Sequence, residues 1–229
     1  MRILIHAYPG RMWYVEEYLV PDLISQGADP GEIEIWNDSE GRGNLYACME
    51  CFQSLKGDGG TWHIQDDVLP CRDFVERCRQ LDEGVVYGFC SPHFRDDPDQ
   101  AGRAYMPDAW HSFQCVRIPD SYARECAEWF FSGAWRSSPS DELPILKATN
   151  AGDDTFFREF LQDRHGTETV YNARPCLVEH VDFLVGGSAV NKWRGFWVRA
   201  HFWEDEELVT EFRAKMKARR KRLREAGLL

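Results

Sequence analysis

The sequence predicts an α/β fold: an open, mainly parallel twisted sheet flanked by helices, with a C-terminal helical extension. Apolar stretches typical of strands alternate with stretches of helical periodicity, and such a β-α-β-α-β order favours a parallel sheet. The length of 229 residues suits one domain with an elaborated end. We therefore expect a main domain over residues 1–190. An aromatic and basic extension over residues 191–229 is expected to be helical and packed on that domain.

The first part of the chain contains five expected strands. Residues 2–8, RILIHAY, form a continuous apolar run, which is typical of a strand buried on both faces. Residues 32–38, EIEIWND, alternate and then break at a loop rich in turn-forming residues. The other expected strands are 60–65, 84–90 and 112–119, and the expected helices are 12–27, 45–55, 70–81 and 120–131.

The second part adds a helix over residues 150–166 and a short strand over residues 171–180. Asp153 and Asp154 stand at the start of this helix, where capping and the helix dipole would explain one of the two acids. The strand ends at His180 and is followed by a glycine-rich loop. A lone histidine after apolar residues is more often structural than a ligand, so His180 by itself is weak evidence for a ligand-binding site.

Charge is spread unevenly along the chain. The net charge is −11, but residues 208–229 carry eight Lys and Arg against two Glu, a net +6 that leaves −17 for the rest. An acidic body repels nucleic acid, whereas the basic tail offers one local surface that could bind it. The alternative is a solvated helix that packs through a narrow apolar stripe of Phe212, Met216 and Leu223.

Cysteine usage and the absence of long apolar runs bear on the compartment. No run of 18 apolar residues occurs, and the N-terminal stretch before Gly10 is too short for a signal peptide. The eight cysteines lie in apolar or helical contexts, so we expect reduced, buried thiols in a cytoplasmic protein. Cys48-Met-Glu-Cys51 lacks a second pair at zinc-ribbon spacing and is weak evidence for a metal by itself.

Polar and aromatic side chains follow three of the expected strands. Tyr8, Asp38 and the pair Asp66–Asp67 each stand where a strand ends. In open α/β sheets, ligands gather beyond the carboxyl ends of the strands, so these positions predict a site. Two adjacent carboxylates repel each other, and a cation beside Asp66 and Asp67 would remove that repulsion.

These features together carry a resemblance to a known family. They are the strand followed by Tyr8-Pro9-x-Arg11, the strand–Asp38 and strand–Asp66–Asp67 steps, the later acidic pair that heads a helix, and the segment RPCLVEHVD. The chain resembles a metal-dependent glycosyltransferase of the GT-A fold over residues 1 to about 190. Its HIQDDVLPCRDF segment is similar to the Asp-x-Asp segment of that family, with Gln65 in place of the first acid. PCLVEH is similar to the late histidine segment.

The resemblance implies a nucleotide-sugar donor, with UDP-sugars favoured, and a Mn²⁺ or Mg²⁺ ion that neutralises the pyrophosphate. It implies that Asp67 is a direct metal ligand, that His180 completes the coordination and that Asp66 faces the ribose or sugar. Tyr8, Pro9 and Arg11 would line the base and phosphate side, and Asp38 would meet the uracil or ribose.

The resemblance also implies a role for the acids at the start of the later helix. In an inverting enzyme, Asp154 or Asp153 would deprotonate the acceptor hydroxyl, with Asp154 preferred. In a retaining enzyme, this acid would position substrate instead, and the sequence leaves both outcomes open.

The acceptor has two candidate classes. Residues 191–203 mix aromatic and basic side chains, among them Trp193, Arg194 and Trp197, which suit sugar rings, nucleobases or a phosphate backbone. A saccharide and a hydroxymethylated DNA base both fit, the second as in phage DNA modification with the base flipped out. The rings would alternatively pack the last helix onto the domain. Two other functions stay open: a metal-dependent nucleotidyltransferase and a non-catalytic nucleic-acid-binding module.

Overall fold

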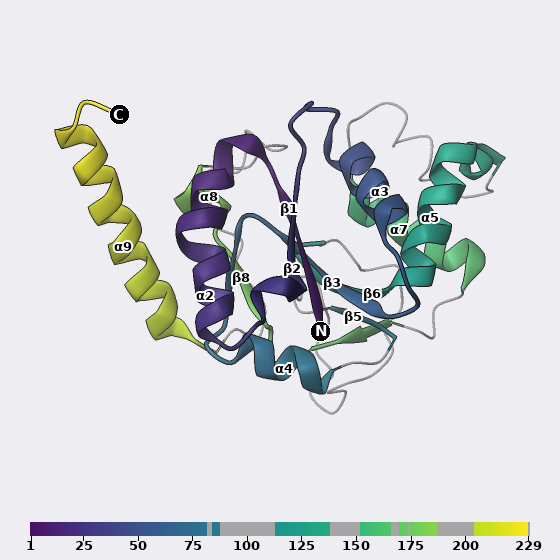
Figure 1. Ribbon diagram of the computed structural model, residues 1–229, viewed down its shortest axis with the longest axis horizontal. Coiled ribbons are helices and arrows are strands. Elements are labelled where there is room, and N and C mark those ends of the chain that lie inside the picture. The colour runs from purple at the N-terminus through teal and green to yellow at the C-terminus, as the bar shows by residue number, and fades with distance from the viewer. Residues whose placement is uncertain are drawn as a thin grey trace.

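The computed structural model describes residues 1–81, 84–87, 113–137, 152–165, 170–173, 175–186 and 204–228. Figure 1 shows a central sheet with helices on both faces and the helix α9 along one side. The strands of the main sheet are β1 (Arg2–Ala7), β2 (Ile33–Asn37), β3 (Gly60–Gln65), β5 (Val85–Tyr87), β6 (Cys115–Pro119) and β7 (Val170–Asn172). A second sheet pairs β4 (Val68–Pro70) with β8 (Val178–His180). The predicted α/β class is confirmed.

The main sheet is mixed, with the order β2-β1-β3-β6-β5-β7. The strand β1 pairs in parallel with both β2 and β3, and β5 pairs in parallel with β7. The strand β6 runs antiparallel to both of its neighbours. The parallel half, β2-β1-β3, brings three carboxyl ends to one edge, and this edge carries the predicted site.

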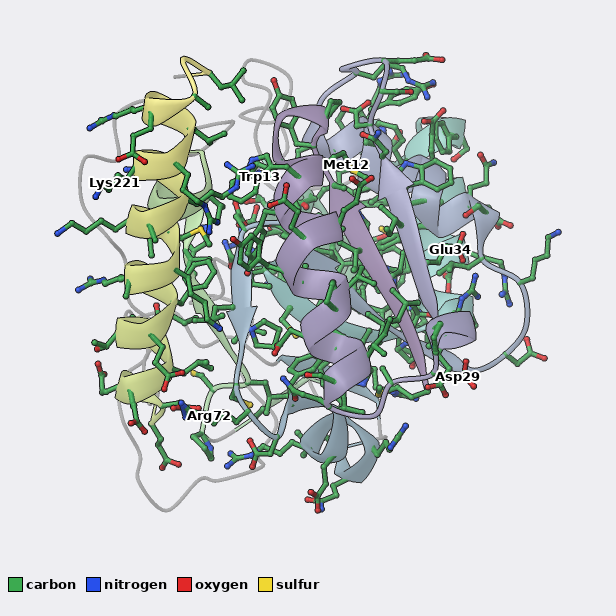
Figure 2. All side chains as sticks on the ribbon, turned by 60° about the vertical axis from the view of Figure 1, so that its left-hand side comes forward. Met12, Trp13, Asp29, Glu34, Arg72 and Lys221 are labelled. Carbon is green, nitrogen blue, oxygen red and sulfur yellow. The ribbon has the colours of Figure 1, made fainter. Side chains whose placement is uncertain are left out.

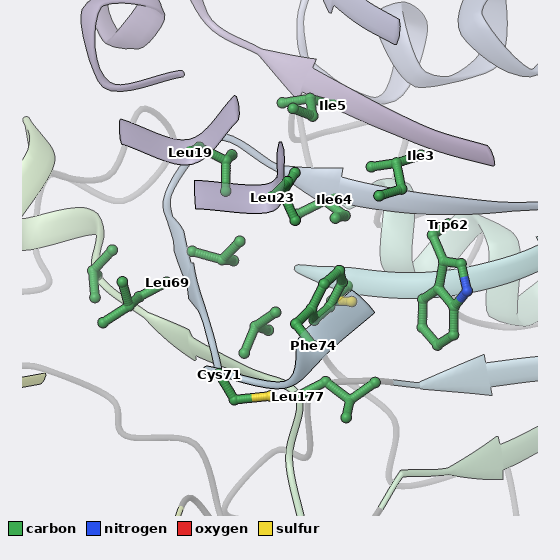
Figure 3. Packing of buried hydrophobic residues seen from close by; sticks show 14 of the residues in the cluster. Ile3, Ile5, Leu19, Leu23, Trp62, Ile64, Leu69, Cys71, Phe74 and Leu177 are labelled. Atoms are coloured by element: carbon green, nitrogen blue, oxygen red, sulfur yellow. The ribbon is translucent and has the colours of Figure 1, made fainter. Parts of the chain in front are cut away.

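Helices cover both faces of the sheet. One face is covered by α2 (Val20–Ser25) and α4 (Phe74–Gln80), and the other by α3 (Asn44–Ser54), α5 (Asp120–Ser132) and α7 (Asp153–Arg164) (Figure 1). Ile3 and Ile5 pack into the first core with Trp62 and Phe74 (Figure 3), whereas Leu4 packs into the second core with Phe52. The strand β1 is therefore buried on both faces, as its apolar run predicts.

The helical stretch after β1 is irregular. It consists of a 3₁₀ turn (Pro9–Arg11), α1 (Met12–Tyr14), a π-helical turn (Val15–Leu19) and α2. Pro21 has no N–H to donate to the carbonyl four residues earlier, and the π turn ends two residues before it, at Leu19.

The helix α9 (Glu206–Glu225) forms the predicted C-terminal helix. Val209, Phe212 and Met216 are buried, and the Phe212 ring meets Tyr14 edge-on at 5.7 Å. Leu223 is only half-buried, so the packed stripe covers the first half of the helix. A short helix, α8 (Asp182–Val185), contacts α9. In the described part of the chain, no helix is both long and apolar enough to cross a membrane.

Two predicted elements are placed differently by the structure. Residues 68–70 form the strand β4, so the helix expected from residue 70 begins at Phe74. The single strand expected over residues 171–180 is two strands, β7 and β8, which lie in different sheets. Pro175 lacks the N–H that a continuous strand needs at this point. The partner of β4 lies far away in the sequence, so no local pattern marks it.

Candidate functional site

The site begins where the parallel strands end. The backbone N–H of Asp38 donates to the Ala7 carbonyl at 3.1 Å, and that of Asp66 donates to the His6 carbonyl at 3.1 Å. These bonds fix the first residues after β2 and β3 beside the end of β1. The backbone N–H of Tyr8 donates to Asp66 Oδ2. Tyr8, Asp38 and Asp66 therefore meet at one edge of the sheet, as their strand-end positions predict.

Arg11 lies between the two adjacent acids. Its guanidinium contacts Asp66 Oδ1 at 2.7 Å through Nη2 and Asp67 Oδ2 at 2.7 Å through Nη1. All three side chains are buried, at 8%, 1% and 6% exposure for Arg11, Asp66 and Asp67. The 3₁₀ turn Pro9–Arg11 directs this guanidinium back under the end of β3. Arg11 thus supplies one positive charge against two carboxylates, and the buried Asp67 Oδ1 has no hydrogen-bond partner among the described residues.

The small sheet brings His180 to Asp67. In the β4–β8 ladder, Val68 lies opposite His180, and the backbone N–H of Val181 donates to the Asp67 carbonyl at 2.8 Å. His180 Nε2 lies 3.5 Å from Asp67 Oδ2 and 4.0 Å from Asp182 Oδ2. The fold therefore brings together Asp67 and His180, the two residues predicted to hold the metal. Asp182 was not predicted to belong here, although its place two residues after His180 offered a signal.

The two acids behave as one titrating pair. Burial raises the pKa of Asp66 to about 7, against the lowering effect of Arg11 and with a further increase from Asp67. Burial also favours protonation of Asp67, but Arg11 and His180 outweigh it and hold the pKa of that carboxyl below its usual range. The pair thus releases one proton in acid and a second near neutrality.

Asp67 and His180 are spaced as a pair of ligands for a divalent cation. Around an octahedral ion with bonds of about 2.1 Å, neighbouring ligands stand about 3 Å apart and opposite ligands about 4.2 Å apart. The 3.5 Å between His180 Nε2 and Asp67 Oδ2 lies between these values, whereas the ligand atoms of Asp67, His180 and Asp182 do not all lie within 4.8 Å of one another. Arg11 contacts Asp67 through Oδ2 and leaves Oδ1 as a further donor. Three carboxyl groups, those of Asp66, Asp67 and Asp182, therefore face one arginine and one histidine.

The later acidic pair joins the site through Gln65. The Gln65 Nε2 amide at the end of β3 donates to Asp153 Oδ2 at 3.2 Å. Burial raises the pKa of Asp153 to about 7, with a further increase from Asp154 and opposing hydrogen bonds from Asn44 and Gln65. Asp154 is half-buried, and its Oδ1 accepts the backbone N–H of Thr155 at 2.7 Å. Of the two acids, Asp153 is the one whose carboxylate reaches β3.

Other predicted site residues lie at the rim or outside the described residues. Tyr8 is 48% exposed, and Pro9 beside it is also exposed. Asp38 is half-buried and accepts the backbone N–H of Arg42 at 3.2 Å. Trp193, Arg194 and Trp197 lie outside the described residues. The role of Gln65 as a link to Asp153 was missed because its partner is distant in the sequence.

The fold is similar to solved transferases at low identity. No protein-family model matches the chain, and no curated protein does. The inositol-1-phosphate CTP transferase from T. maritima has a TM-score of 0.46 and 11% identity, covering 94% of this chain and 96% of that chain. The glycosyltransferase GlyE of Streptococcus pneumoniae has a TM-score of 0.47 and 9% identity, covering 99% and 64%. S. aureus TarS has a TM-score of 0.48 and 9% identity, covering 78% and 36%. These scores lie below 0.5 and the identities below 25%, so the likenesses assign no function to this chain.

Proposed function

We propose that this chain is a glycosyltransferase that moves a sugar from a nucleotide-sugar donor to an acceptor hydroxyl. The observation that carries the proposal is the convergence of Arg11, Asp66, Asp67 and His180 at the carboxyl ends of β1 and β3, beside a buried acid, Asp153. A cation-binding face next to a general-base candidate is what transfer from a diphosphate leaving group needs.

The donor side is assigned to the strand ends. Asp67 and His180 would hold a Mn²⁺ or Mg²⁺ ion, with Asp182 beside them and the remaining positions left to phosphate oxygens and water. When bound, the ion neutralises the charge that develops on the departing nucleoside diphosphate. Arg11 orients both carboxylates, and the exposed ring of Tyr8 offers a stacking surface for a base such as uracil. Asp66 and Asp38 are assigned to the ribose or sugar.

The acceptor side is assigned to the start of α7. A carboxylate with a pKa of about 7 is matched to proton transfer near neutral pH. Asp153 would accept the proton of the attacking hydroxyl, while Gln65 holds its carboxylate through Oδ2. This assignment implies an inverting transfer. Asp154, the preferred acid from the sequence, would steady the turn that presents Asp153, since its Oδ1 accepts the Thr155 N–H.

The products of donor turnover test this proposal. Sugar transfer or hydrolysis of a UDP-sugar releases a nucleoside diphosphate, whereas a nucleotidyltransferase releases pyrophosphate from a nucleoside triphosphate. We expect nucleoside diphosphate to form with Mn²⁺ present, and Asp67→Asn to abolish its formation. Asp153→Asn and Asp154→Asn are expected to keep donor binding, and the variant that loses transfer identifies the base. Pyrophosphate as the product would replace the proposal with nucleotide transfer.

The acceptor is proposed to be a saccharide or a modified DNA base, and the basic helix separates these two classes. Lys217 and Lys221 are exposed on α9, and Lys221 points away from the domain (Figure 2). A DNA acceptor would be attracted by such charges, with an affinity that falls steeply with salt. The double change Lys217→Glu/Lys221→Glu should then reduce transfer to hydroxymethylated DNA, while transfer to a saccharide would stay unchanged.

A further inference from the structure

A second cluster of metal-ligating side chains lies on the opposite face of β1 from the first core. His6 on β1, His63 on β3 and Cys51 on α3 converge beneath the site edge. His6 Nε2 lies 3.0 Å from His63 Nδ1 and 3.8 Å from Cys51 Sγ. Among the described residues, this is the only group of three or more His, Cys, Asp or Glu side chains whose ligand atoms all lie within 4.8 Å of one another.

We propose that His6, Cys51 and His63 bind a zinc ion. In a tetrahedral zinc site, bonds of about 2.0–2.1 Å to nitrogen and 2.3 Å to sulfur place two nitrogens about 3.3 Å apart, and a nitrogen and a sulfur about 3.5 Å apart. The observed 3.0 Å and 3.8 Å separations need shifts of only a few tenths of an ångström. Two imidazoles and a thiolate favour zinc over Mg²⁺ or Mn²⁺, which prefer oxygen ligands.

The protonation states suit this role. Burial lowers the pKa of His6 to about 4 and that of His63 well below its ordinary value, so both rings are neutral and keep a lone pair for a metal. Burial raises the pKa of the Cys51 thiol, which is therefore protonated until a metal binds. Zinc binding breaks the S–H bond, forms a Zn–S bond and releases one proton to solvent.

The site would be buried and separate from the candidate donor site. His63 and Cys51 are buried and His6 is partly buried, with the Phe52 ring edge-on to both imidazoles. The three side chains leave a fourth coordination position to water. The ion would tie α3 to the two central strands. Because α3 begins at Asn44, which bonds Asp153, this tie would also steady the edge that holds the proposed base.

Cobalt spectroscopy on the full-length protein tests the proposal. Co²⁺ added to chelator-treated protein is expected to give a near-ultraviolet charge-transfer band, which requires a thiolate ligand and should correspond to one thiolate-bound Co²⁺ per chain. Cys51→Ser should abolish this band. Cys48→Ser is the matched control, because Cys48 is an equally buried thiol one turn earlier on α3 and should leave the band intact. His6→Gln, at the partly buried position, should weaken Co²⁺ binding and serves as the second variant should Cys51→Ser not fold.

Two results would overturn the zinc site. One is wild-type protein that folds without any thiolate–cobalt band, which would leave His6 and His63 as a hydrogen-bonded pair. The other is a band that persists in Cys51→Ser, that forms in His6→Gln at the same Co²⁺ concentration as in wild type, or that is lost in Cys48→Ser. Asp67→Asn is expected to retain the band, since the donor site contains no thiol. Failure of the glycosyltransferase proposal and failure of this one are therefore separable.

Discussion

Arg11 compensates the repulsion between the two neighbouring buried carboxylates, Asp66 and Asp67. Its guanidinium contacts one oxygen of Asp66 and one of Asp67, and all three groups are nearly excluded from solvent. A planar fork of donors suits two acceptors at once, which a lysine ammonium does not reproduce. The pair is therefore compensated without a metal, and the proposed divalent ion would add to an arrangement that Arg11 has already oriented.

Removing Arg11 should destabilise the fold strongly. Arg11→Ala leaves two buried carboxylates uncompensated, and we expect a loss of about 3–5 kcal/mol in the free energy of unfolding at pH 7. Arg11→Lys should restore only part of the loss. Denaturant unfolding measures both changes. Arg42→Ala, which removes a solvent-exposed arginine paired with Glu50, is the control and should change stability little. Equal, small effects for Arg11 and Arg42 would contradict the role of Arg11.

Asp153 should make stability depend on pH. The carboxyl of Asp153 titrates near its ordinary value of 3.8 when unfolded and near 7 when folded, so between these values the folded state holds more protons. Its contribution to the free energy of unfolding therefore falls as pH rises from about 4 to 7. Asp153→Asn removes this penalty, and we expect it to gain stability relative to wild type between pH 5 and 8. The gain should be on the order of 2–4 kcal/mol, at about 1.4 kcal/mol for each pKa unit.

Thermal melts at a series of pH values measure this difference. Asp163→Asn is the matched control, since Asp163 is an exposed acid on the same helix. The raised pKa should also appear in the pH dependence of turnover. If Asp153 is the base, the turnover rate must fall below pH 7 as its carboxyl is protonated. A wild-type melting profile parallel to that of Asp153→Asn would contradict the raised pKa.

At the scale of elements, a two-stranded ladder brings the site together. The strand β4 follows Asp67 directly, and its antiparallel partner β8 carries His180 opposite Val68. The Tyr14 hydroxyl donates to the Val68 carbonyl at 2.6 Å, so the helical stretch that follows Arg11 also anchors β4. The relative placement of Arg11, Asp67 and His180 thus depends on contacts between three short elements that are far apart in sequence.

The helix α9 closes the outer side of this arrangement. Phe212 packs against Tyr14 at 5.7 Å and Tyr18 at 6.4 Å, and the Arg219 guanidinium lies 3.5 Å from the centre of the Trp13 ring. Phe212→Ala should cost about 3–5 kcal/mol of unfolding free energy. Leu223→Ala, at a half-buried position on the same helix, should cost much less. Equal losses in calorimetry would mean that the packed stripe extends along the whole helix.

Local sequence patterns predicted most of the strands and helices, but few of the contacts between segments that are distant in the sequence. The runs at residues 2–8 and 60–65 carry their own periodicity, and the structure has β1 and β3 there. Asp66, Asp67 and His180 were singled out by their places at strand ends and by the resemblance to GT-A glycosyltransferases. The structure places His180 3.5 Å from Asp67, and their roles stay predictions. The strand β4 and the pairing of Arg11 with both acids were not predicted, because each depends on a partner in a distant segment. Contacts between distant segments leave no periodic pattern in the local sequence.

At the scale of the whole molecule, the candidate site lies where the strands of the parallel half of the sheet end. The order β2-β1-β3 brings Asp38, Tyr8 and Asp66 to one edge, and the antiparallel β6 separates this half from β5 and β7. The charge is divided as well, with an acidic body and a basic last helix. Because the body is acidic, binding of the proposed diphosphate donor would require a cation or an arginine at the site. The basic helix α9 is the surface suited to a polyanion.

Donor binding is the measurement that tests the central claim most directly. The protein would be melted with Mn²⁺ and a panel of UDP-, GDP-, ADP-, CMP- and TDP-sugars, because a ligand that binds only the folded state raises the melting temperature. We predict a Mn²⁺-dependent rise with one nucleotide, UDP first, that is lost in Asp67→Asn. No rise with any nucleotide sugar, or an equal rise in Asp67→Asn, would contradict a donor site built on Asp67.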